Sequence, residues 1–447
     1  MKTVHIVSLG CPKNLVDSEV MLGVLENAGY SVVEEPEKAQ LLLVNTCGFI
    51  RPAVEEAIDE ILRLSEYKAQ DSSKTLVVTG CLVQRYGQEI VQELPEVDLF
   101  IGTDEFSHIA QLIKDLDQQK EVPLISSEPY YLMSGTTARK VSTPFFRAYL
   151  KITEGCNNRC SYCMIPSIRG DLRSRSIEDL LVEIRRLEQS GVKELTLIAQ
   201  DLTAYGNDLD GSVNLEGLLD TILQKSQIPW IRLLYLYPVS INDSLLELMA
   251  TQSRVLPYFD IPFQHVSDGV LKRMNRRYGM AELDSLIARI RHKVPNNSIR
   301  TSLITGFPGE TEEDVLEMVE CLKRWRLDHV GVFQYADEEG SPAYEMRDKV
   351  SDEIKIQRYN RIMEVQAEIS GSNLSRFDGG LEEVLVEGVS RESDLLLEGR
   401  TRFQAPDIDG CVYIADGTAS PGDLVKVRIT ETHTYDMVGE ITGDEER

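Results

Sequence analysis

Two hydrophobic patterns alternate along the middle of the chain. Short β-rich runs recur, and stretches with apolar residues at helical spacing lie between them. Such alternation is typical of a parallel sheet, so about residues 142–372 are expected to form an open sheet or an incomplete (βα)6 barrel. Loops after the carboxyl ends of the strands would then build the site. The six runs are RAYLKI, ELTLIAQ, WIRLLYL, YFDIPF, SIRTSLITG and DHVGVFQY.

The same alternation covers residues 1–135, where three apolar runs each end in a cysteine. TVHIVSLGC ends at Cys11, LLLVNTCG contains Cys47 and TLVVTGC ends at Cys81, and a helical pattern follows each run. In a parallel sheet the carboxyl ends of the strands share one edge, so these thiols are expected to converge although 36 and 34 residues separate them. A ligand set for a metal cluster and three buried thiols at strand ends both fit this pattern.

The pattern changes again after residue 375. Five short β-rich runs, EEVLVEG, DLLLEGRT, GCVYIADG, GDLVKVRIT and MVGEIT, are separated by turns. They predict a small antiparallel β-barrel over residues 375–444, joined to the core by a helix over about 351–374. The expected fold class is therefore α/β, with an N-terminal parallel sheet domain, an incomplete barrel and a C-terminal small barrel.

The length and net charge of the chain limit the classes of protein to which it can belong. A chain of 447 residues allows two or three cores, and its net charge of −26 opposes indiscriminate binding to polyanions. The chain has no run of 18 apolar residues, and the stretch from Val4 to Leu9 is too short for a signal peptide. We therefore expect a cytoplasmic protein without a membrane partner, in which the eight cysteines stay reduced.

The most specific motif is EGCNNRCSYCMIPSIRG, which places Cys156, Cys160 and Cys163 directly after the first strand of the core. Three thiolates suit a cubane iron–sulfur cluster in which one iron stays open to bind a substrate. Zinc is the alternative metal. A structural zinc site normally has a fourth Cys or His ligand, however, and residues 164–204 contain neither. Three unligated thiols remain the structural alternative.

This C-x3-C-x2-C spacing, with Tyr162 before the last cysteine, resembles the signature of the radical S-adenosylmethionine family. The resemblance implies that the open iron chelates S-adenosylmethionine, whose reductive cleavage gives a radical that abstracts hydrogen. Tyr162 would then lie beside the cofactor. The resemblance to this family also implies the partial barrel.

Several loop residues are candidates for binding this cofactor. Gly306 and Gly309 follow a strand and precede a helix, so backbone there could approach the nucleoside, although an ordinary tight turn fits equally. Gln200 and Gln264 end two other strands of the expected barrel. His265, the residue next to Gln264, could transfer protons or simply be a hydrogen-bonded loop residue.

The segments GCPKNLVDSE and NTCGFI are similar to those of the methylthiotransferases, a family within this superfamily. The resemblance covers the whole chain and implies two 4Fe-4S clusters. Cys11, Cys47 and Cys81 would hold the second cluster, which carries the sulfur that is inserted into a C–H bond. One S-adenosylmethionine would donate the methyl group and another would make the radical. Both triads should then face one cavity, with the N-terminal sheet edge on the barrel mouth.

Further short segments resemble those of the RimO-type branch of that family, which modifies an aspartate β-carbon in a small-subunit ribosomal protein. These segments are Pro12-Lys13, LYLYPVSI and Gln264-His265. Leu202 departs from the sequence pattern of the family. The reductant would be a protein such as flavodoxin or ferredoxin.

The C-terminal segment resembles a TRAM domain, a module that many relatives use to hold transfer RNA. Residues 375–447 carry 17 acidic and 7 basic side chains, a net charge of −10. Such a surface should repel transfer RNA and attract a basic ribosomal protein. A tRNA (adenosine) methylthiotransferase is the competing enzyme. A two-cluster electron carrier is a weaker alternative, because a carrier gains nothing from open irons.

Overall fold

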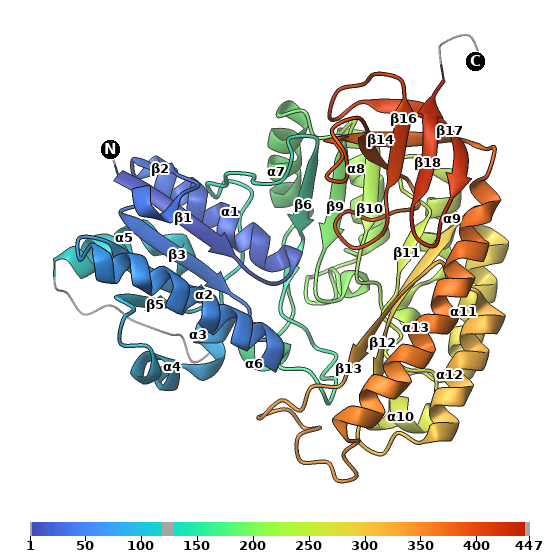
Figure 1. The fold of residues 1–447 in the computed structure, drawn as a ribbon, viewed down its shortest axis with the longest axis horizontal. Helices are drawn as coiled ribbons and strands as arrows, with labels where there is room; N and C mark the ends of the chain where they lie inside the picture. The colour runs from blue at the N-terminus through green and yellow to red at the C-terminus, as the bar shows by residue number, and fades with distance from the viewer. Residues whose placement is uncertain (1, 119–128, 443–447) are drawn as a thin grey trace.

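The computed structural model describes residues 2–118 and 129–442. Residue 1, residues 119–128 and residues 443–444 of the expected domain ranges lie outside the described residues. Figure 1 shows an N-terminal sheet domain in blue, a central barrel in green to orange, and a small β-barrel in red at one end of the central barrel. No helix in the described ranges combines the length and apolar character needed to cross a membrane.

The N-terminal domain is a five-stranded parallel sheet with strand order β2-β1-β3-β4-β5. Alternate residues of β3 point to opposite faces, as the two-residue period of a strand requires. Leu41 and Leu43 pack toward α1 and α5, whereas Leu42 and Val44 pack toward α2. The elements are β1 Lys2–Ser8, α1 Pro12–Asn27, β2 Tyr30–Val32, β3 Leu41–Thr46, α2 Arg51–Gln70, β4 Thr75–Gly80, α3 Cys81–Tyr86, α4 Gln88–Glu93, β5 Leu99–Ile101 and α5 Ile109–Asp117.

The central part contains all six strands that the sequence predicts. They form two parallel three-stranded sheets, β6-β9-β10 and β11-β12-β13. A bridge between Ile231 and Val255 and a hydrogen bond from Leu236 N to Asp260 O (2.9 Å) join the two sheets. The strands are β6 Arg147–Lys151, β9 Glu194–Ile198, β10 Trp230–Leu233, β11 Tyr258–Asp260, β12 Ser298–Thr305 and β13 His329–Gln334. The expected incomplete barrel is thus confirmed.

Helices follow these strands and cover the outside of the barrel (Figure 1). The long helix α13, Asp352–Leu374, is the connector that the sequence predicts. The other elements are α6 Ile165–Arg169, α7 Ile177–Gln189, α8 Leu215–Lys225, α9 Asp243–Thr251, α10 Asp268–Arg273, α11 Met280–Lys293, α12 Glu312–Trp325 and the antiparallel pair β7 Thr153–Glu154 with β8 Arg173–Ser174. Turns of 3-10 type lie at Pro36–Lys38, Phe106–His108, Leu202–Ala204, Pro238–Ser240 and Ser375–Phe377.

The C-terminal segment closes into a barrel with strand order β14-β15-β16-β18-β17. The strands are β14 Leu381–Val389, β15 Leu397–Thr401, β16 Val412–Asp416, β17 Leu424–Thr432 and β18 Met437–Ile441. The sequence predicts an antiparallel barrel, but β16 and β18 run parallel. Five strands closed in a ring cannot all alternate in direction, so at least one neighbouring pair must be parallel.

This small barrel covers the amino ends of the central strands. Glu194, the first residue of β9, is within 2.5 Å of both Arg232 and Arg400. Trp230, the first residue of β10, donates its indole N–H to Glu383 (3.1 Å). The C-terminal barrel therefore lies at the edge of the central barrel opposite the loops that carry the thiols (Figure 1).

Candidate functional site

The three clustered thiols lie between β7 and α6, beyond the carboxyl end of β6. Each sulfur accepts one hydrogen bond. Asn158 N donates to Cys156 Sγ and Ile165 N donates to Cys163 Sγ, both at 3.5 Å, while Arg276 Nη1 donates to Cys160 Sγ at 3.4 Å. Donors aimed at sulfur favour the thiolate form, which is the form that binds metals.

Burial and the charges of neighbouring thiols raise the pKa of Cys156 and of Cys163. The pKa of Cys163 rises to about 12 because the thiol is buried and because Cys160 and Cys156 lie close to it. Burial likewise raises the pKa of Cys156. A metal cation reverses this effect, since a coordinating thiol is deprotonated outright. The donor set of three neighbouring sulfurs, each facing a hydrogen-bond donor, fits an iron–sulfur cluster.

The three scattered thiols also come together, as the sheet topology predicts. Cys11 precedes α1, Cys47 follows β3 and Cys81 begins α3, on three adjacent strands of the sheet. Gly10 has φ of +92°, and a β-carbon there would lie 2.8 Å from that of Cys47. Burial raises the pKa of Cys47 to about 12, and the charges of Cys81 and Cys11 add to the effect.

No group of three His, Cys, Asp or Glu in residues 2–118 and 129–442 converges as the ligands of one metal ion do. A cubane has a different requirement, because each thiolate binds a separate iron.

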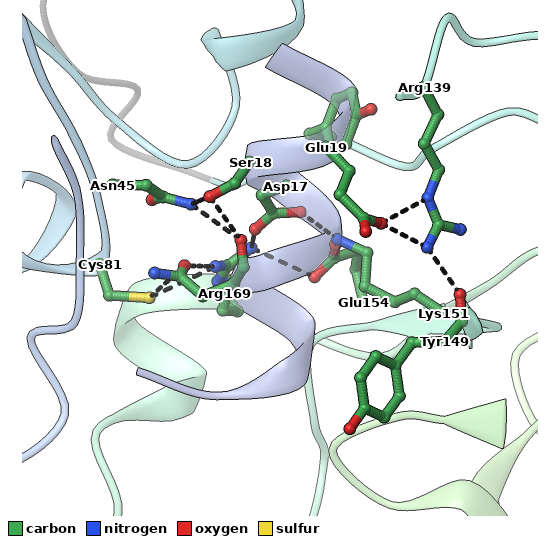
Figure 2. Close-up of polar contacts among 12 residues, drawn as sticks. Asp17, Ser18, Glu19, Asn45, Cys81, Arg139, Tyr149, Lys151, Glu154 and Arg169 are labelled. Carbon is green, nitrogen blue, oxygen red and sulfur yellow. Dashed lines mark hydrogen bonds and ion pairs between the residues drawn. The ribbon is translucent and has the colours of Figure 1, made fainter. Parts of the chain in front are cut away.

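A buried network of charges joins Cys81 of the N-terminal domain to the central barrel (Figure 2). Arg169, the last residue of α6, donates to Cys81 Sγ at 3.4 Å and contacts Asp17 at 2.7 Å. Asp17 also pairs with Lys151 of β6, which pairs with Glu154. These four charged side chains are at most 4% exposed. The network thus fixes the thiol edge of the N-terminal domain against the carboxyl end of the central barrel.

Lys13 crosses the same interface. Its ammonium lies 3.4 Å from the carbonyl oxygen of Ala199, just after β9, and 3.4 Å from the ring centroid of Tyr235. Burial lowers the pKa of Lys13, while nearby Cys11 acts in the opposite direction. Tyr235 has φ of +64°, a strained value for a bulky residue.

Residues 335–349, which follow β13, form a bridging loop between the two sets of thiols. Glu338 accepts hydrogen bonds from Arg51 N (2.7 Å) and Arg85 Nη1 (2.8 Å) of the N-terminal domain. Arg85 also donates to Gly48 O (3.0 Å), next to Cys47. At the other end of the loop, Ala343 N donates to Ser161 O (2.8 Å), between Cys160 and Cys163.

The residues predicted to bind the cofactor lie at the carboxyl ends of the central strands. Gln200 is half-buried after β9, and Gln264, after β11, has φ of +71° and pairs with Leu303. Gly306 and Gly309 follow β12 with φ of +78° and +75°. Tyr162 packs beside Phe307 and Tyr335, so it lies near this turn, and burial raises its pKa.

His265 is completely buried. Its Nδ1 accepts a hydrogen bond from Ser267 N (3.0 Å), and its Nε2 lies 3.5 Å from Glu310 Oε2. Burial alone would raise the pKa of Glu310, but His265 and Arg358 hold it below its usual value. Because these contacts hold the turn at residues 306–310, they suit a positioning residue. The catalytic role of His265 stays a prediction.

The sequence pattern assigned no site role to Tyr235, Arg169 or Arg276. The position of Tyr235 at the end of a β-rich run was the one signal available for it. Arg169 and Arg276 became identifiable only once the fold placed them 3.4 Å from thiol sulfurs. Two further cysteines belong to neither set of thiols. Cys321 is buried in α12, and Cys411 is half-buried just before β16.

Three family models match the chain. Residues 3–102 match the uncharacterized protein family UPF0004, residues 150–322 match the radical SAM superfamily, and residues 379–442 match the TRAM domain.

Curated relatives are similar over nearly their whole length. A protein of Desulfotalea psychrophila named ribosomal protein uS12 methylthiotransferase RimO is 53% identical over 99% of both chains. A protein of Geotalea uraniireducens with the same name is 50% identical over 98% of both chains.

Solved structures share the fold at low identity. The radical S-adenosylmethionine methyltransferase TsrM from Kitasatospora setae, with cobalamin and a 4Fe-4S cluster bound, has a TM-score of 0.56 and 15% identity. The match covers 77% of each chain. The cobalamin-dependent radical enzyme OxsB has a TM-score of 0.51 and 12% identity, over 82% of this chain and 56% of that one.

Proposed function

This chain belongs to the RimO family of radical S-adenosylmethionine methylthiotransferases, and we propose that it inserts a methylthio group at the β-carbon of an aspartate in the small-subunit ribosomal protein uS12. The structural observation that best supports this function is that two sets of three thiols, 75 or more residues apart in the chain, lie on one domain interface. Membership of the family implies one four-iron cluster and S-adenosylmethionine.

We assign that cluster to Cys156, Cys160 and Cys163. When bound, it and S-adenosylmethionine supply the hydrogen abstraction that activates an inert C–H bond. The chain itself supplies the backbone N–H groups and the Arg276 guanidinium that donate to the three sulfurs. These donors offset negative charge on the sulfurs and so tune the reduction potential.

We assign a second four-iron cluster to Cys11, Cys47 and Cys81. The close approach of Gly10 to Cys47 and the contact of Arg169 with Cys81 support this assignment. Arg169 ends the helix that follows Cys163, so a residue close in the chain to the first site contacts a thiol of the second. The second site would supply the sulfur that is transferred.

We further propose that Tyr162, Gln200, Gln264, Gly306 and Gly309 contact S-adenosylmethionine. All five lie around the carboxyl ends of β6, β9, β11 and β12, and the positive φ angles of the two glycines suit close approach of backbone to a ligand. His265 would position this surface through Glu310.

The proposed partners follow from this substrate. A basic ribosomal protein complements the net charge of −10 in residues 375–447, and a flavodoxin or ferredoxin would supply electrons in the cytoplasm. The proposed domains are residues 1–135, 142–372 and 375–444. The curated relatives are named for uS12, so a tRNA methylthiotransferase is not favoured.

A competition between substrates tests the proposal. The purified, iron-reconstituted enzyme receives S-adenosylmethionine, a reductant, and equal amounts of uS12 and transfer RNA. Mass spectrometry should find a methylthio group on one uS12 aspartate and none on RNA. A methylthio group on transfer RNA, or on neither substrate, would refute it.

A further inference from the structure

In the part of the chain that the structure describes, the buried lysines and arginines pair with carboxylates, with one exception. Among the described residues, seven of eight have a carboxylate oxygen within 4.0 Å. These seven are Lys74, Lys151, Arg169, Arg175, Arg232, Arg358 and Arg400. Lys13, which is 7% exposed, has no such partner in the described part of the chain. A buried charge without a counter-charge is costly, so this position calls for an explanation.

The contacts that Lys13 does make leave its ammonium incompletely paired. An ammonium group has three N–H donors and no acceptor. One donor faces Ala199 O at 3.4 Å, and the face of Tyr235 lies below the nitrogen. Neither group is an anion. The charges of Cys11 and Asp260 also act on the ammonium, but Cys11 is assigned to the second cluster and Asp260 already accepts from Arg300 Nη1 and Tyr235 N, each at 2.9 Å.

Lys13 lies where the two assigned sites meet. It follows Cys11 by two residues, and its contacts come from loops at the carboxyl ends of β9 and β10. The Tyr235 ring that supports the ammonium is held in place by a strained backbone, with φ of +64°, whose N–H is fixed by Asp260. Strain of this kind persists where the surroundings enforce it, commonly at functional sites.

We propose that Lys13 binds the carboxylate of the target residue and thereby selects an aspartate as substrate. This inference rests on the proposed function, since it takes uS12 as the substrate. The modified β-carbon is bonded to the carboxylate carbon, so a cation that holds the carboxylate also positions the reacting carbon. An asparagine of the same shape would leave the ammonium without its counter-charge.

Binding measurements with two forms of uS12 test this role. The probes are uS12 with its natural target aspartate and uS12 with asparagine there, each titrated against the full-length, iron-reconstituted enzyme. The wild-type enzyme should bind the aspartate form about tenfold or more tightly than the asparagine form. Lys13→Met should reduce that preference to less than about threefold, and Lys13→Arg should keep most of it.

Lys2→Met is the matched control. Lys2 also lies over a tyrosine, 5.2 Å from the ring centroid of Tyr30, but at the start of β1 and away from the carboxyl edge of the barrel. This variant should keep the wild-type preference. Iron content and melting temperature check that each variant is folded.

Two results would overturn the inference while leaving the proposed function intact. One is that the wild-type enzyme methylthiolates uS12 but binds both forms equally, a result that needs no variant. The other is that Lys13→Met weakens both forms by the same factor, as loss of a purely structural contact between domains would. Failure of the wild-type enzyme to modify uS12 would instead refute the proposed function.

Discussion

Glu194 is a single residue on which two parts of the molecule depend. It is completely buried between Arg232 of the central barrel and Arg400 of the C-terminal barrel, and Arg400 also pairs with Glu387. Burial alone would raise the pKa of Glu194, but the two guanidinium groups lower it from 4.5 to about 2. Removing one partner of such a group leaves uncompensated buried charge.

Glu194 should therefore make the stability of the protein depend on acid pH. Because its pKa is lower in the folded state, its contribution of about 3 kcal/mol is present above pH of about 4.5 and is lost as the pH falls toward 2. Glu194→Gln should lower the melting temperature at pH 7 and flatten its decline between pH 5 and 3. The control Glu93→Gln changes an exposed glutamate. Scanning calorimetry showing equal melting temperatures for Glu194→Gln and wild type at pH 7 would contradict this account.

The functional or structural role of a residue could be predicted from the sequence in some cases and not in others. The six cysteines of the two assigned sites were identifiable because each lies at a junction of strand and helix or in a dense motif. Asp17 and Glu19 look like the polar face of a surface helix, yet α1 buries them. Their partners, Lys151 and Arg139, are 134 and 120 residues away, and no local periodicity encodes such a partner.

At the scale of elements, the fold class, the six central strands and the connecting helix were predictable, because each depends on a local hydrophobic period. How these elements dock against one another was not predictable. The bridging loop at residues 335–349 carries no strand or helix, and its role emerges only from Glu338, which reaches Arg51 and Arg85 across the domain interface. Both carboxyl oxygens of Glu338 are used in these contacts.

Glu338→Gln should loosen the N-terminal domain from the central barrel. The substitution removes the negative charge that pairs with Arg85, whose side chain is only 5% exposed. We expect several-fold more 5'-deoxyadenosine per methylthio product, because hydrogen abstraction and sulfur transfer need both sites in register. Chromatography of both products from one reaction measures this ratio.

The neighbouring residue gives the control for this prediction. Glu339 is exposed, and only its backbone carbonyl contacts Arg85, so Glu339→Gln should leave the product ratio unchanged. An unaltered ratio in Glu338→Gln would show that the loop does not couple the two sites.

At the scale of the whole molecule, the acidic C-terminal barrel lies at the end of the central barrel opposite the thiols (Figure 1). Its charge can therefore act on a basic substrate mainly through long-range attraction, which affects the association rate more than contact at the site. Deleting the segment is a poor test, because loss of Arg400 would expose the buried Glu194. Neutralising surface charges avoids this problem.

Replacing four exposed acids of the C-terminal barrel by their amides should slow association with uS12 several-fold at low salt. The difference should vanish near 1 M salt, where the Debye length falls to about 3 Å. The four are Glu392, Asp394, Asp416 and Asp423, and the control replaces Asp220, Glu313, Glu317 and Glu364 on the helices around the central barrel. Stopped-flow fluorescence measures the rates. An equal slowing in the control would assign the effect to net charge alone.

We propose that two separate three-thiol sites cooperate across one interface. This cooperation is tested by replacing Cys11, Cys47 and Cys81 together by alanine and assaying 5'-deoxyadenosine and methylthiolated uS12 in the same reaction. We expect that about four irons remain, that 5'-deoxyadenosine still forms, and that uS12 gains no methylthio group. Methylthiolated uS12 from this variant would contradict it.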